Sequence, residues 1–68
     1  MSIEDAIENL ESEIAKLSKQ IEDYERGDKK SFAYTEGGEP VDVTQDEIVA
    51  RKATRARWEA IIAEFKSV

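Results

Sequence analysis

The sequence predicts a small α+β fold in which a helix, a β-hairpin and a second helix follow one another, with the two helices packed antiparallel. Three observations support this fold: a helical repeat of apolar residues near the start, alternation of apolar and polar residues around a Gly-Gly pair, and a capping pattern before a long amphipathic stretch. The 68 residues are enough for one domain, which we expect to span 1–68. The alternative is an all-α helical hairpin or coiled coil.

The first helix is expected at about 3–26. Its apolar residues recur alternately four and three residues apart for three heptads, a spacing that strands cannot produce because their side chains repeat every two residues. The repeat consists of Ile3, Ile7, Leu10, Ile14, Leu17, Ile21 and Tyr24, and all but the first are assigned to the core. Ser2 and Asp5 have the spacing of a capping box, and Gly27 is a natural C-terminal stop.

This apolar stripe is narrow, which indicates lengthwise contact with another helix. Two partners fit the pattern. One is the second helix of the same chain, in an antiparallel intramolecular pair, and the other is a helix of a different chain, in an intermolecular coiled coil. A domain of this size buries little surface, so assembly with copies of itself or with another protein would add stability.

A β-hairpin is expected at about 30–43. Gly37 and Gly38 can supply the positive φ values of a two-residue type I′ turn. That turn places Tyr34 opposite Val41 and Phe32 opposite Val43. The four side chains would then form one apolar face that packs on the helices, with Phe32, Val41 and Val43 in the core. A disordered loop between the two helices is the alternative.

The second helix is expected at about 45–66. Thr44 and Glu47 form a second capping-box pattern in front of it. Two neighbouring stripes follow. The first is made of small residues, namely Val49, Ala53, Ala56, Ala60 and Ala63. The second is bulky and is assigned to the core, namely Trp58, Ile61, Ile62 and Phe65.

The composition argues against catalysis. The chain has no histidine and no cysteine, so the commonest general base and the commonest metal ligands are missing. We therefore expect no enzyme activity, no catalytic residues, no metal site, no cofactor and no small-molecule ligand. No apolar run is long enough to cross a bilayer, and the first residues are acidic, unlike a signal peptide. The expected compartment is the cytoplasm or an assembly that forms there.

The main polar feature is a cluster of basic residues in the second helix, formed by Arg51, Lys52, Arg55 and Arg57, which Lys29 and Lys30 could extend. One interpretation is pairing with the acidic first helix, since residues 1–26 carry eight acids and three bases. The other is a docking patch for an acidic protein surface or for DNA phosphates. A formal net charge of −6 disfavours broad contact with nucleic acid. Tyr34 is a further candidate for protein interaction.

The order of these features resembles the phage head-to-tail joining protein W family (gpW-like). The resemblance covers about residues 10–66. Its carriers are the stretch Tyr24-Glu25-Arg26-Gly27-Asp28-Lys29-Lys30, then Phe32-Ala33-Tyr34, Gly37-Gly38, Val41-Asp42-Val43-Thr44, and the helix ending Trp58-Glu59-Ala60-Ile61-Ile62-Ala63-Glu64-Phe65.

The resemblance implies a structural virion protein of the head-tail connector, which assembles as a ring between the portal and the tail. Its partners would be portal or tail proteins and copies of itself, and DNA would pass through as cargo without sequence-specific contact. An acidic lumen would let DNA slide. The competing hypothesis is a small helical hairpin that oligomerises or binds another protein, for example a phage-encoded inhibitor of a host protein. Exposure of Phe32, Tyr34, Val41 and Val43 would favour this second hypothesis.

Overall fold

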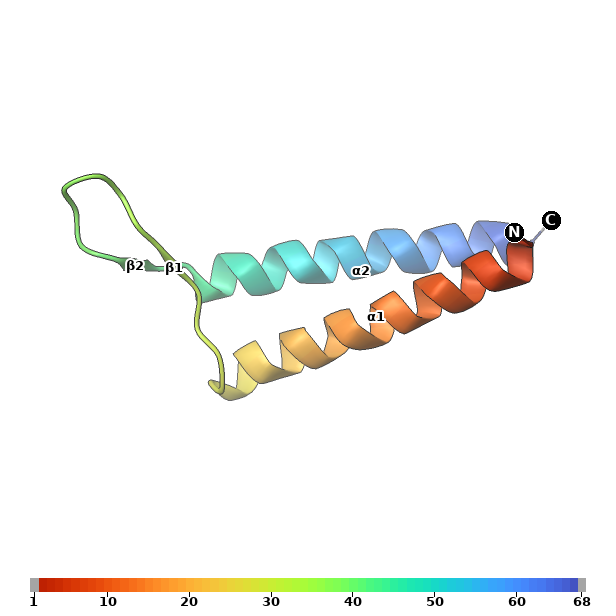
Figure 1. Ribbon diagram of the computed structural model, residues 1–68, viewed down its shortest axis with the longest axis horizontal. Coiled ribbons are helices and arrows are strands. Elements are labelled where there is room, and N and C mark those ends of the chain that lie inside the picture. The colour runs from red at the N-terminus through yellow and green to blue at the C-terminus, as the bar shows by residue number, and fades with distance from the viewer. Residues whose placement is uncertain (1, 68) are drawn as a thin grey trace.

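The computed structural model describes residues 2–67. Its elements are α1 (Ile3–Arg26), β1 (Phe32–Ala33), β2 (Val41–Asp42) and α2 (Thr44–Lys66). The helices lie side by side and antiparallel, and the two strands form a ribbon that extends beyond one end of the helix pair (Figure 1). The predicted order of helix, hairpin and helix is confirmed. Neither helix in the described part of the chain has the length and apolar character needed to cross a membrane.

The two ends of α1 are closed by local hydrogen bonds. The Ser2 hydroxyl accepts from the amide of Asp5 at 3.2 Å, as expected for an N-cap. Gly27 follows the last turn in the left-handed conformation, with φ at +83°. This turn lets the amide of Asp28 reach the carbonyl of Asp23 at 2.9 Å, which satisfies one of the helix's free carbonyls.

Gly27→Ala is expected to lower the free energy of unfolding by about 1–2 kcal/mol. No atom lies within 4 Å of an added Cβ, so the cost is the left-handed backbone conformation alone. Gly27→Asn should cost less, because asparagine tolerates this conformation better than alanine. Urea unfolding of both variants measures the difference, and equal costs for alanine and asparagine would contradict this explanation.

The core lies between the helices, in the half nearer the ribbon. Leu17, Ile21 and Ile48 form a buried cluster, against which Tyr24 and Trp58 pack. Ile62 is also buried, further along α2. The other expected core residues of the helices are half-buried, namely Ile7, Leu10, Ile14, Ile61 and Phe65. Ile48 was not among the residues expected in the core.

The small-residue stripe of α2 faces solvent and does not meet α1. Val49, Ala53, Ala56, Ala60 and Ala63 are all exposed. The face that meets α1 instead carries a heptad series of its own, made of Ile48, Arg51, Arg55, Trp58, Ile62 and Phe65. Two arginines interrupt this series, so its apolar members alone do not show the repeat.

The ribbon has a different register from the one expected. Phe32 pairs with Asp42, and Ala33 pairs with Val41. The turn explains the difference: the amide of Gly38 bonds the carbonyl of Thr35 at 3.1 Å, and within residues 2–67 the glycines with positive φ are Gly27 and Gly37. A type I′ turn at Gly37 and Gly38 would need both in that conformation.

The shift of one residue removes the expected apolar face. Because neighbouring residues of a strand point to opposite faces, Phe32 and Val41 now lie on different sides of the ribbon. Phe32 is 45% exposed and Val41 is 54% exposed, so the assignment of both to the core is wrong. Val43 is half-buried at the base of the ribbon.

The start of α2 also differs from the capping-box prediction. Thr44 is the first residue of the helix, and the N-cap position is Val43, which makes no side-chain capping bond. The Thr44 hydroxyl instead accepts from the amide of Ser31 at 3.0 Å, which ties the helix to the first arm of the ribbon. Asp42 accepts from the amide of Thr44 at 2.9 Å and satisfies that donor in its place.

Candidate protein-interaction surfaces

Arg51 lies in the contact between the two helices. Its guanidinium donates to the Oε1 atom of Gln20 at 2.8 Å and lies 5.4 Å from the centre of the Tyr24 ring. An ion pair with Glu47, one turn earlier in α2, has a separation of 2.8 Å. The Nε atom of Arg51 is buried and makes no hydrogen bond among the described residues. The Nη1 and Nη2 atoms of Arg51 are therefore already bonded within the chain.

Two more bases of the cluster also contact α1. Arg55 donates to the hydroxyl of Ser18 at 3.2 Å, and Lys52 pairs with the carboxylate of Glu25 at 3.3 Å. Arg57 is exposed, and no ion pair of this residue is found within residues 2–67. Three of the four bases thus contact α1, although only Lys52 pairs with an acid there, and the cluster does not form a continuous free basic patch.

The ribbon carries three of the exposed large apolar side chains of the described residues. Tyr34 is 77% exposed, and Phe32 and Val41 are each about half exposed. The strands are only two residues long, and the segment 34–40 between them contains the turn. A two-stranded ribbon leaves the outer backbone groups of both strands available to a partner. Aromatic side chains on such an element are typical of protein-binding surfaces.

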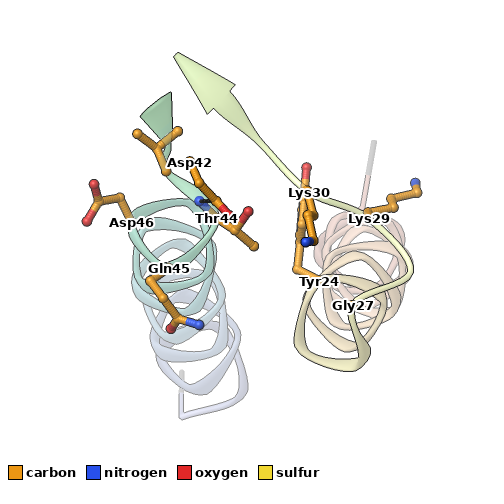
Figure 2. A pocket seen from close by; sticks show the side chains of 9 residues that line it. Tyr24, Gly27, Lys29, Lys30, Asp42, Thr44, Gln45 and Asp46 are labelled. Atoms are coloured by element: carbon orange, nitrogen blue, oxygen red, sulfur yellow. Dashed lines mark hydrogen bonds between the residues drawn. The ribbon is translucent and has the colours of Figure 1, made fainter. Parts of the chain in front are cut away.

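An open hollow of about 470 Å³ lies at the base of the ribbon. Its lining comes from the end of α1, the following loop, the end of β2 and the start of α2, and comprises Tyr24, Gly27, Lys29, Lys30, Asp42, Val43, Thr44, Gln45 and Asp46. Figure 2 shows Asp42 at the end of β2 and Asp46 in the first turn of α2, with Lys30 across the hollow and Lys29 pointing away from it. Lys30 therefore faces the carboxylates of Asp42 and Asp46, and charges of both signs line the hollow.

Asp42 provides a pH-dependent contact where the ribbon joins the helices. The hydroxyl and the amide of Thr44 hold the pKa of Asp42 below its ordinary value. The stabilisation is therefore fully present above the unfolded-state pKa of about 3.9, and it is lost as the pH falls through the lower folded-state pKa. Carboxyl NMR titration should give Asp42 a midpoint below about 3.9, and Thr44→Val should raise that midpoint. An ordinary midpoint in the unmodified chain would contradict the contact.

The described residues contain no group of three or more acidic, histidine or cysteine side chains placed to hold a metal ion. The candidate residues are instead distributed over two regions. Lys29, Lys30 and Tyr34 belong to the ribbon and the segment that leads into it, and the basic cluster lies along α2.

Comparisons with protein-family models, with curated proteins and with solved structures find no match for this chain. The gpW-like resemblance therefore rests on the pattern of residues and elements alone.

Proposed function

We propose that this chain is a non-enzymatic assembly protein that binds another protein through its β-ribbon. The observation that carries the proposal is the exposure of Phe32, Tyr34 and Val41 on an element that projects from the helix pair. A ribbon that served only to join the helices would not need aromatic side chains in contact with water. Burial of these side chains and pairing of the free strand edges would both favour binding.

The exposed ribbon favours the interaction-module hypothesis, because a compact domain would have covered these side chains. The basic cluster does not supply the docking surface, since Arg51, Lys52 and Arg55 all bind side chains of α1. Arg51 and Arg55 also form ion pairs with acids of α2. The partner is a protein with an apolar groove or an exposed sheet edge. Lys29 and Lys30 beside the ribbon add attraction for acidic groups at the rim of that groove.

The test places a photo-crosslinking amino acid at position 34 and, as a matched control, at position 12, where Ser12 is exposed on α1. In cells of the source organism, position 34 is expected to give one discrete protein adduct and position 12 none. Phe32→Ala should abolish the adduct while leaving helix content and thermal stability unchanged, because Phe32 is outside the core. Equal adducts from both positions, or none from position 34, would rule out the ribbon as the binding element.

A more specific proposal is the head-tail connector of a tailed phage, which the order α1, β1, β2, α2 and the acidic balance support. In this role the ribbon would dock on a portal or tail protein, and copies of the chain would form a ring around passing DNA. The test is co-purification with the portal protein from the same genome, with Tyr34→Ala as the variant expected to lose it. If that genome encodes no portal protein, the connector proposal fails while the ribbon proposal stands.

A further inference from the structure

A second open surface lies far from the ribbon, in the half of the helix pair nearer the chain ends. It is a mostly apolar groove of about 480 Å³ along one side of the pair, lined by Glu11, Ile14, Ala15, Glu59, Ile62, Ala63 and Lys66. The buried cluster of the core does not reach this half, because it involves Leu17, Ile21 and Ile48. Two helices alone cannot cover the apolar side chains on both of their open sides.

The exposed area has the size expected if a partner covers part of it. A folded monomer of this mass exposes about 4,300 Å². This chain exposes 5191 Å². The excess of roughly 900 Å² is comparable with the ~800 Å² that each partner contributes to an interface of standard size. A second copy would therefore return the chain to an ordinary exposed area.

The charges of the groove suit a second copy. Glu11 belongs to α1, and Glu59 and Lys66 belong to α2, so Lys66 is the base that a second copy can offer to Glu11. Within the chain, Lys52 of α2 pairs with Glu25 of α1. Lys66 lies two heptads after Lys52, and Glu11 lies two heptads before Glu25, so Lys66 and Glu11 occupy the same level of the antiparallel pair. A partner with its helices exchanged would place a lysine opposite each glutamate.

We propose that two copies of this chain pack groove against groove as a four-helix bundle, with a two-fold axis parallel to the helices. Each α1 then lies on the α2 of the other copy, and both ribbons extend from the same end. Ala15 and Ala63, both exposed in the single chain, allow the helices to approach closely, and the half-buried Ile14 completes the apolar contact. Lys66 of each copy faces Glu11 of the other copy, so every contact occurs twice.

The test measures molar mass by light scattering over a wide range of protein concentration. We expect the unmodified chain to reach twice the monomer mass of 7.7 kDa. Ala63→Glu places a charge in the apolar contact and should weaken the dimer at least about tenfold. The matched control is Ala53→Glu, the same change at an exposed position of α2 outside the groove, which should leave the dimer unchanged. Circular dichroism checks that both variants keep their helices.

A charge exchange tests the orientation of the two copies. Glu11→Lys and Lys66→Glu should each weaken the dimer, and the double variant should restore it. A chain that stays monomeric at every concentration would overturn the proposal, as would equal effects of Ala63→Glu and Ala53→Glu. No rescue by the double variant would overturn the proposed two-fold arrangement. Crosslinking at position 34 measures partner binding by the ribbon independently of the dimer. Failure of the dimer and failure of the proposed function can therefore be told apart.

Discussion

Ile21→Ala is expected to lower the free energy of unfolding by about 2–5 kcal/mol, the largest effect of any single truncation in this chain. Ile21 is only 2% exposed and lies in the buried cluster with Leu17 and Ile48. The truncation removes buried methyl groups and leaves a cavity that two rigid helices cannot close. Leu17→Ala should fall in the same range for the same reason. A chain of this length has roughly 3–10 kcal/mol of total stability, so either variant approaches unfolding.

Urea unfolding followed by circular dichroism measures this loss, at a concentration where the unmodified chain and the variant have the same oligomeric state. The matched control is Ile3→Ala, the same truncation in the same helix at a residue that is 54% exposed. The control should cost less than about 1 kcal/mol, because little buried surface is lost. A loss below about 1 kcal/mol for Ile21→Ala would mean that the contact between the helices is not the core.

Arg51→Ala is expected to lower the free energy of unfolding by about 1–3 kcal/mol, the largest effect expected for a polar residue. The change removes the hydrogen bond to Gln20, the ion pair with Glu47 and the contact of the guanidinium with the Tyr24 ring. It also removes the apolar stem of the arginine from the helix contact. Arg57→Ala is the control in the same helix. Arg57 is exposed, and its truncation should change stability by less than about 0.5 kcal/mol.

Arg51→Met separates packing from polar contacts at the same position. Methionine keeps a stem of similar length, and it removes the buried Nε atom that has no hydrogen-bond partner. Because the methionine stem keeps the packing and Glu47 is partly exposed to water once its partner is gone, this variant should lose less stability than Arg51→Ala. Equal losses for Arg51→Met and Arg51→Ala would show instead that the hydrogen bonds of the guanidinium hold the helices together.

The position of α1 could be predicted because its information is local. Seven apolar residues at heptad spacing, a capping serine and Gly27 all act within one or two turns, and the helix ends where these residues place its ends. The contact face of α2 could not be read in the same way. Arg51 and Arg55 occupy core-facing positions, and they are acceptable there because Gln20 and Ser18 of α1 meet them. The apolar residues alone form two stripes, one of which contains Val49 and neither of which contains Ile48.

The ribbon shows most directly which structural features the sequence alone could not predict. The alternation of apolar residues and the Gly-Gly pair predicted that a hairpin would form, and one does. Its register depends on which residues turn the chain, and a shift of one residue exchanges the faces of every side chain. Only the folded chain decided this, through the turn that ends at Gly38 and the bond that joins Thr44 to Ser31.

The sequence by itself determined the order of the elements, the extent of α1 and the absence of the side chains most used in catalysis. These properties depend on residue types and on spacings of a few residues. The tertiary structure decided which face of α2 meets α1, that most of the basic cluster is bound within the chain, and that the ribbon projects with its aromatic side chains exposed. Those properties depend on contacts between residues about 13 to 37 positions apart, and the alternatives differ by only a few kcal/mol.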